Sequence, residues 1–490
     1  FQKYNNSKLL KKLEPLFFVL IGLLIFHPNL PYDEHHYNFV IGSVNDMLNG
    51  KPLLYETTNQ YGILSTYFLS GVFKFVNLSY EAFSFISFLA YYAYYIGLYY
   101  LIKIWLRSHL WAYLGTSVIL AVTYFLQISP SLSALLYPGF SPFRYGLLLP
   151  VAVLLLLYSR QQNKLVKESA IIISVLAFFW NYDTGAYLAI STFLTLGYFV
   201  LQESGLWSGR LRKLFYLALK FLGYTLGVFG LLNLINYVAF NSWPLWDELV
   251  ADILRAPAQN KIPFIGFYQV YIYIYVSVLL TLLYFGLKHK RVNWLLLFFT
   301  IYGIFSFTYY AGNSAWSLLY PITVPLILIG LYYGANYFTQ RLVFSILVSV
   351  LVFSGLVLVV KIPVEFGSRD YSLLGKYTRQ DIHDQAIKED ALTLRDDYMF
   401  LDKIALIHQR GTKILIYAKK SNLFNFYELA QISNKTRAGE LVSQVELKDP
   451  EYLFIEIDRN DQVEFITGRV LQGYAKIDSL KTLDVYQRQL

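Results

Sequence analysis

The sequence predicts an α-helical multi-span membrane protein with about 11 transmembrane helices and outer juxtamembrane helices, plus a small C-terminal α/β extracytoplasmic domain. Hydrophobic residues make up 56% of the 490 residues, whereas soluble domains contain about 45–50%. Apolar runs long enough to cross a bilayer recur along residues 1–361. Beyond about residue 365, short apolar runs alternate with charged stretches, which predicts a second domain at 362–490.

Basic loops give the expected orientation. Residues 1–361 contain 23 Lys and Arg, and 17 of them fall in the cytoplasm if the N-terminus lies there. The positive-inside rule then predicts a cytoplasmic N-terminus and an extracytoplasmic C-terminal domain in the cell (inner) membrane. The predicted spans are 15–30, 83–103, 111–128, 143–159, 168–182, 185–202, 214–240, 267–287, 292–311, 316–338 and 341–361.

The outer loop at 31–82 is predicted to hold two membrane-associated segments. Residues 37–50 carry apolar side chains at helical spacing, which predicts a short amphipathic helix on the outer membrane surface. Residues 62–78 are apolar, but a crossing there would move most later basic clusters outside. We therefore expect 62–78 to be juxtamembrane or re-entrant.

The C-terminal domain is predicted from alternating strand and helix patterns. Residues 413–418, 452–457 and 482–487 have the composition of buried strands, and 381–409 and 424–431 that of helices. No Gly-rich phosphate loop is present in 362–490, so a lid or docking role is the simplest interpretation.

Composition excludes several kinds of chemistry. The chain has no cysteine, so it forms no disulfide and has no thiolate nucleophile or Cys-based metal site. The net charge of +9 comes from the membrane loops, because residues 362–490 carry 18 basic and 20 acidic residues. No nucleic-acid partner is needed to explain this basic surplus.

The strongest functional signal is the run Asp33, Glu34, His35 and His36, directly after the first predicted span. An ionised carboxylate near hydrocarbon is tolerated only where it is solvated, paired or functional. The run is therefore either a solvated loop or a site that holds a general base or a metal ligand.

The residues after this run resemble a known family. The segment 50–55, Gly-Lys-Pro-Leu-Leu-Tyr, is followed by Gln60, Tyr61 and Gly62. This arrangement resembles the GT-C superfamily of membrane glycosyltransferases, such as protein O-mannosyltransferases and lipid A aminoarabinose transferases. Ile63 stands where that family usually has proline.

The resemblance implies an inverting glycosyltransferase on the extracytoplasmic face. Its donor would be a hexose or pentose on a polyprenyl phosphate, its acceptor a glycan, lipid or protein, and its surroundings membrane lipid. One carboxylate suffices as general base, because phosphate leaves as a stable anion. The family's acid corresponds to Asp33 or Glu34, and Asp33 lies nearer the end of the span.

Further candidates follow from charge and position. Arg144 begins a span on the outer side, where it would either bind the donor phosphate or reach the interface. Arg255 and Lys261 lie in the longest outer loop, which would either form the lipid-donor entrance or remain a solvated face.

The expected sugar or acceptor pocket draws on several outer loops. Each of its members has a plainer alternative, as a helix cap or an interfacial side chain. No cofactor is required, and His-Asp-Glu adjacency gives only a weak signal for a divalent cation, since neighbouring side chains rarely converge on one ion. The candidates are His35, His36, Gln60, Tyr61, Asp183 and Asn313.

Two other functions remain open from sequence. A lipid-linked glycan flippase or transporter would need ionisable groups near the midplane or two related halves. Here the charged residues gather at span ends, and no convincing internal repeat is found. A catalytically inactive scaffold of the same fold is the other alternative.

Overall fold

The computed structural model forms two compact units. The first comprises residues 1–33, 84–230 and 256–370, and the second 34–83, 231–255 and 371–490. The structure describes residues 8–25, 34–57, 62–126, 141–203, 206–246, 269–289, 292–312, 319–337, 349, 379–426, 435–458 and 461–489.

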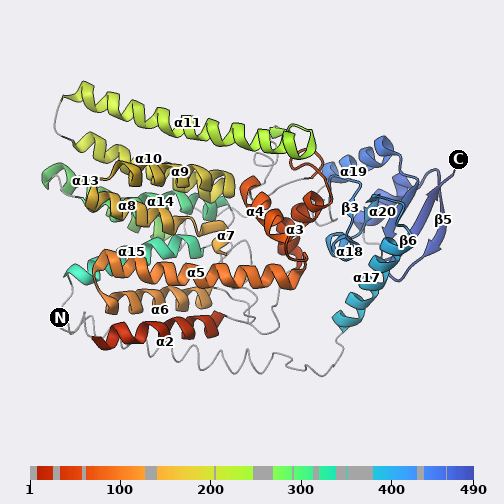
Figure 1. Ribbon diagram of the computed structural model, residues 1–490, viewed down its shortest axis with the longest axis horizontal. Helices are drawn as coiled ribbons and strands as arrows, with labels where there is room; N and C mark the ends of the chain where they lie inside the picture. The colour runs from red at the N-terminus through yellow and green to blue at the C-terminus, as the bar shows by residue number, and fades with distance from the viewer. Residues whose placement is uncertain are drawn as a thin grey trace. The chain divides into compact units, whose positions relative to one another are not determined.

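The first unit is a bundle of helices (Figure 1). Neighbours along the chain pack as pairs, such as α8 with α9, α9 with α10, and α13 with α14, while α14 also contacts α8 and α10. The helices are α2 (Lys8–Ile25), α5 (Tyr80–Leu106), α6 (His109–Leu126), α7 (Pro142–Tyr145), α8 (Leu148–Gln161), α9 (Lys164–Trp180), α10 (Tyr182–Gln202), α11 (Trp207–Phe240), α13 (Val270–His289), α14 (Trp294–Gly312) and α15 (Tyr320–Tyr337).

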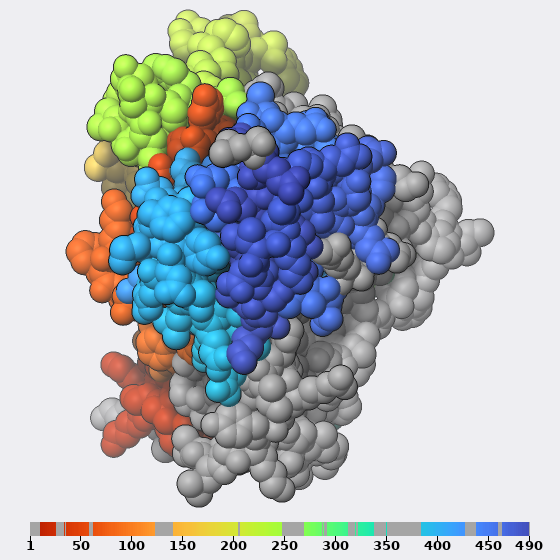
Figure 2. All heavy atoms as spheres, turned by 90° about the vertical axis from the view of Figure 1, so that its right-hand side faces the viewer, coloured from red at the N-terminus to blue at the C-terminus, as the bar shows by residue number. Residues whose placement is uncertain are grey.

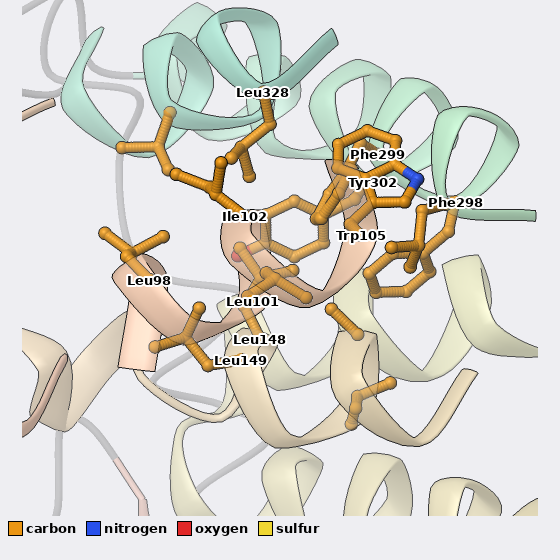
Figure 3. Close-up of a cluster of buried hydrophobic side chains, with 14 of the residues drawn as sticks. Leu98, Leu101, Ile102, Trp105, Leu148, Leu149, Phe298, Phe299, Tyr302 and Leu328 are labelled. Atoms are coloured by element: carbon orange, nitrogen blue, oxygen red, sulfur yellow. The ribbon is translucent and has the colours of Figure 1, made fainter. Parts of the chain in front are cut away.

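The core of this bundle is built from leucine, isoleucine and aromatic side chains. Figure 3 shows Trp105 of α5 beside Phe299 and Tyr302 of α14, with Leu148 and Leu149 of α8 nearby. The centroids of the Trp105 and Phe299 rings are 5.7 Å apart, a distance typical of favourable aromatic pairs. Large rings thus hold α5, α8 and α14 together.

The described helices agree with the predicted spans. Five of them are long and apolar enough to cross a membrane, within α5, α7–α8, α10, α11 and α14, and shorter apolar helices lie in α4, α6, α13 and α15. Each predicted span from 83–103 to 316–338 overlaps one of the helices α5 to α15. The span at 341–361 lies outside the described residues except for residue 349, which is helical.

The second unit begins with α3 (Glu34–Leu48) and α4 (Ile63–Phe73), which pack together. The helix expected at 37–50 is confirmed, but it is buried on more than one face. Tyr37, Ile41 and Val44 are buried, and so are the polar Asn38 and Asp46, because α3 also contacts α18 and β3. The 11 residues of α4 span about 16 Å, too short to cross a hydrocarbon core of about 30 Å.

The C-terminal part of this unit is a three-layer α/β domain. A four-stranded sheet has the order β2-β4-β6-β5, with β2 parallel to β4 and the other pairs antiparallel, and β1 pairs in parallel with β3. The strands are β1 (Lys403–Ile404), β2 (Leu406–Ile407), β3 (Ser421–Asn422), β4 (Tyr452–Glu456), β5 (Tyr474–Ser479) and β6 (Leu483–Arg488). The helices are α17 (Arg379–Asp396), α18 (Gly411–Ala418), α19 (Lys435–Lys448) and α20 (Asp461–Val470).

Helices cover both faces of the sheet. On β4, Leu453 and Ile455 pack against α19 and α20, whereas Phe454 packs against α17 and α18. Because both faces are buried, the strand is a continuous apolar run rather than an alternating one. Figure 2 shows these helices and strands, coloured light to dark blue, as one packed body.

The predicted C-terminal elements are partly correct. The strands expected at 452–457 and 482–487 are confirmed as β4 and β6. The helix expected at 381–409 is correct only in its first part, because α17 ends at Asp396 and residues 397–409 form turns and the strands β1 and β2. The strand expected at 413–418 is wrong, because those residues belong to helix α18. Of the helix expected at 424–431, residues 424–426 are not helical and the remainder lies outside the described residues.

Candidate functional site

The predicted acidic pair lies at the start of α3. Glu34 is the first residue of α3, and Asp33 lies just outside the described residues. An acid in the first turn of a helix is stabilised by the helix dipole and by unpaired backbone N–H groups. The sequence thus places a carboxylate at a helix N-terminus, at one end of the buried helix of the second unit.

Glu34 is held by two cations from α18 and the residue before it. Arg410 Nε donates to Glu34 Oε1 at 2.7 Å, and Arg410 Nη2 donates to Oε2 at 2.5 Å. Lys413 Nζ donates to Glu34 Oε2 at 3.3 Å. The two-pronged arginine contact fixes the orientation of the carboxylate as well as its position.

Asp384 of α17 completes this cluster of charges, Glu34, Asp384, Arg410 and Lys413. It accepts hydrogen bonds from Arg410 at 2.5 Å and from Lys413 at 2.7 Å. Burial raises the pKa of Asp384, but the hydrogen bonds from Lys413 and Arg410 outweigh burial and hold that pKa below its usual value. Two carboxylates and two cations therefore balance each other.

The other end of α3 is fixed by a buried ion pair. Lys51 Nζ lies 3.0 Å from Asp46 Oδ2, and both side chains are fully buried. The same Nζ donates to the carbonyl oxygens of Asn422 at 3.1 Å and Phe424 at 2.8 Å. Burial raises the pKa of Asp46 and lowers that of Lys51, and the pairing opposes both effects.

The end of α3 explains why Lys51 and Asp46 meet. Gly50 has a φ of 84°, Lys51 N donates to Asp46 O, and Gly50 N donates to Met47 O. These are the bonds of a Schellman cap, which glycine favours because it has no Cβ. The cap turns the chain back so that the Lys51 side chain reaches the last buried carboxylate of the helix.

Arg144 and Asp183, which the sequence suggested separately, are brought together in the first unit. Ser141 caps α7, and Pro142 opens it. Arg144 Nη2 is bonded to Asp183 Oδ2, and its guanidinium lies 4.2 Å from the centroid of the Tyr309 ring. The Arg144 side chain is 7% exposed and that of Asp183 is 30% exposed, so Asp183 is the more accessible member of the pair.

Asp183 also takes part in the start of α10. Asn181 caps this helix by accepting from Thr184 N, and the Thr184 hydroxyl donates to the Arg144 carbonyl at 2.7 Å. The capping role expected for a polar residue at this turn therefore falls to Asn181. Asp183 also accepts a hydrogen bond from Thr184 N, and its carboxylate binds the Arg144 guanidinium.

The remaining predicted residues are placed as follows. His35 and His36 belong to α3, and the His36 ring packs edge-on to Phe39 at 6.2 Å. Within the part of the chain that the structure describes, no three His, Cys, Asp or Glu side chains are grouped to hold a metal ion. Gln60, Tyr61, Arg255, Lys261 and Asn313 lie outside the described residues.

Sequence reasoning missed Arg410, Lys413 and Asp384. They lie 26 to 379 positions from the groups they bind, so no local pattern joins them. The one available signal is the spacing of Arg410 and Lys413, three positions apart at the start of a helix, where both can face the same way. That signal was hidden because residues 413–418 were expected to be a strand.

Two solved structures are similar to this chain. ArnT from Cupriavidus metallidurans, in a structure bound to undecaprenyl phosphate, has a TM-score of 0.50 and 12% identity, over 96% of this chain and 97% of that chain. The Archaeoglobus fulgidus oligosaccharyltransferase, in complex with zinc and sulfate, has a TM-score of 0.47 and 12% identity, over 96% of this chain and 73% of that chain. No protein-family model and no curated protein matches the chain.

The chain therefore shares its fold with ArnT, in agreement with the resemblance to GT-C enzymes seen in the sequence. It is a multi-pass membrane protein with a small C-terminal α/β domain. At 12% identity the likeness establishes the fold, and the reaction has to be argued from the site.

Proposed function

We propose that this protein transfers a sugar from a polyprenyl-phosphate donor to an acceptor hydroxyl on the extracytoplasmic face of the membrane, with inversion at the anomeric carbon. The observation that carries this proposal is the fold shared with ArnT, whose solved structure is bound to undecaprenyl phosphate. The acid at the start of α3, after the first predicted span, supplies the group that the reaction needs.

In this proposal Asp33 is the general base. Both oxygens of Glu34 accept hydrogen bonds from Arg410, and one also accepts from Lys413. A carboxylate held in this way is poorly suited to take a proton during turnover, which leaves its neighbour Asp33 for that role. The base removes the acceptor hydroxyl proton, the oxygen attacks the anomeric carbon, and the bond from that carbon to the phosphate oxygen breaks.

The leaving phosphate needs a cation, and Arg144 is the proposed one. Phosphate departs with the bonding electron pair, so no acid is required to protonate it. A guanidinium suits this role because it stays charged and can bind phosphate with two N–H groups. Its contacts with Asp183 and Tyr309 hold the guanidinium in one orientation.

The test of the base is Asp33→Asn, which keeps size and hydrogen bonding but cannot accept the proton. Envelope glycans from cells with and without the protein are compared by mass spectrometry, and transfer is then measured with the variant. We expect turnover to fall about 10²- to 10⁴-fold. Binding of undecaprenyl phosphate, followed by thermal stabilisation of the purified protein in nanodiscs, should be retained.

Glu34→Gln tests whether the neighbouring carboxylate, rather than Asp33, is the base. Normal transfer by Asp33→Asn together with complete loss in Glu34→Gln would assign the base to Glu34. If both variants transfer normally, the base is neither Asp33 nor Glu34. If the wild type itself transfers no sugar, the glycosyltransferase proposal loses its support, and a flippase or an inactive scaffold takes its place.

Arg144→Ala should behave differently from Asp33→Asn. Removing the cation weakens stabilisation of the departing phosphate, so both turnover and undecaprenyl phosphate binding should fall. Turnover should drop about 10²- to 10³-fold, as for the loss of one transition-state donor. Unchanged undecaprenyl phosphate binding in Arg144→Ala would remove Arg144 from the phosphate site.

A further inference from the structure

Helix α3 is fastened to the C-terminal α/β domain at both of its ends. At the first residue, Glu34 binds Arg410 and Lys413, and these bind Asp384 of α17. At the last turns, Asn45 Nδ2 donates to the Lys420 carbonyl at 2.8 Å, and Lys51 reaches the Asn422 and Phe424 carbonyls.

These contacts are more than surface ion pairs. The Lys413 side chain is 1% exposed and those of Arg410 and Glu34 are 19% exposed. The Lys413 ammonium also lies 5.5 Å from the centroid of the Tyr80 ring, and the Tyr80 hydroxyl donates to Asn38 of α3. Partly buried charges with several partners hold a fixed geometry, whereas exposed pairs rarely do.

We propose that Arg410 and Lys413 are positioning residues for the transfer reaction. They fix Glu34 at the N-terminus of α3, and Glu34 directly follows the proposed base, Asp33, in the chain. The proposal rests on the proposed function and assigns the C-terminal domain a part in it. The domain supplies the cations that set the acid in place, so it acts on the reaction through α3.

Such a restraint matters because the reaction tolerates very little displacement of the general base. A general base must lie within hydrogen-bond reach of the proton that it removes, and a shift of about 1 Å can lower the rate about 10²-fold. A loop between a membrane helix and a short helix would not by itself hold a carboxylate so closely. The two-pronged contact between Arg410 and Glu34 supplies that restraint.

The first experiment measures position without using the reaction. Hydrogen exchange of residues 34–48 is followed by mass spectrometry on the full chain in nanodiscs, for the wild type and for Arg410→Gln. We expect the second turn of α3, whose N–H groups bond to the carbonyls of the first turn, to exchange about 10- to 100-fold faster in the variant, because the helix start loses a charge-assisted hydrogen-bond pair. Arg395→Gln is the matched control, since Arg395 pairs with Asp396 on the surface of α17.

The second experiment measures transfer and undecaprenyl phosphate binding in the same variants. Arg410→Gln should lower turnover about 10- to 100-fold and leave undecaprenyl phosphate binding unchanged, while Arg395→Gln should change neither. Arg410→Lys keeps the charge and should recover part of the turnover. In the double variant Glu34→Gln with Arg410→Gln, the loss should be no larger than in either single variant, because both act through one contact.

The outcomes separate the two proposals. Unchanged exchange of α3 in Arg410→Gln would overturn the positioning role whatever the activity. Faster exchange with normal turnover would overturn it too, because the acid would then not depend on the contact. A wild type that transfers no sugar would instead count against the proposed function, and the exchange result would still show whether Arg410 fastens α3.

Discussion

Lys51 is a fully buried cation in the segment between α3 and α4. Its ammonium has three oxygen partners, the Asp46 carboxylate and the carbonyls of Asn422 and Phe424. An ammonium has three protons to donate, so the described contacts match its capacity. Three hydrogen bonds, rather than one ion pair alone, offset the free-energy cost of burying this charge.

Removing Lys51 should therefore be far more harmful than removing an exposed lysine. Lys51→Met leaves the Asp46 carboxylate buried without its cation, and this should cost about 3–5 kcal/mol of stability. Lys213→Met is the control, because Lys213 pairs with Glu203 on the surface and should cost about 0–1 kcal/mol. Thermal unfolding of both variants in detergent measures the difference, and equal losses would contradict the importance of the buried pair.

Some site residues could be recognised from sequence and others could not. Glu34 and Arg144 were found because a charge beside a long apolar run is costly unless it has a role. Arg410 and Asp384 were not found, because charged residues in a soluble domain are common and their partners lie far away in the chain. The chemistry of a side chain can be read locally, but its partner depends on tertiary packing.

At the scale of elements, the cap of α3 determines where Lys51 goes. Gly50 adopts a left-handed conformation, and a Cβ at this position would meet no atom within 4 Å. The only obstacle to a side chain here is therefore the backbone conformation itself. A left-handed residue with a Cβ costs roughly 1–2 kcal/mol.

Gly50→Ala should accordingly destabilise the protein by about 1–2 kcal/mol. Gly71→Ala is the matched control, since Gly71 lies inside helix α4 and also has open space around its Cβ position. There alanine should stabilise by about 0.5–1 kcal/mol, because it favours the helix. Denaturant unfolding of the two variants should move in opposite directions, and a shared direction would refute the argument from backbone conformation.

Helix α18 shows the limit of reading elements from periodicity. Residues 413–418 form an apolar run of strand length, but nearly every side chain of this helix is buried. A helix that is buried all round loses the alternation of apolar and polar faces that would identify it. In contrast, β4 and β6 were recognised because their runs lie in a sheet covered on both faces.

At the scale of the whole molecule, the expected topology remains a prediction to be tested. Reporter proteins fused after residues 164, 213 and 290 should be read as cytoplasmic, and one fused after residue 361 as extracytoplasmic. The physical reason is the excess of Lys and Arg in the loops assigned to the cytoplasm. A cytoplasmic signal from the last fusion would overturn both the eleven-span arrangement and the outer-face site.

The overall fold class could be predicted from the sequence, but the division of the chain into its two compact units could not. Long apolar runs identify membrane helices with little regard to tertiary detail, so helices α5 to α15 were expected where they occur. The joining of residues 34–83 to the C-terminal domain in one unit depends on contacts such as Lys51 with Phe424. Such contacts have no signal in the spacing of residues.

The fastening of α3 also has a consequence for how the protein is made. Asn45 and Lys420 are separated by 375 positions. At about 5–20 residues per second, a ribosome adds Lys420 roughly 20–75 seconds after Asn45. For nearly all of this interval Glu34 has been synthesised but Arg410 and Lys413 have not, so the first residue of α3 lacks the ion pairs that hold it in the folded protein. Helix α3 is among the earliest parts of the chain to be synthesised and among the last to reach its final contacts.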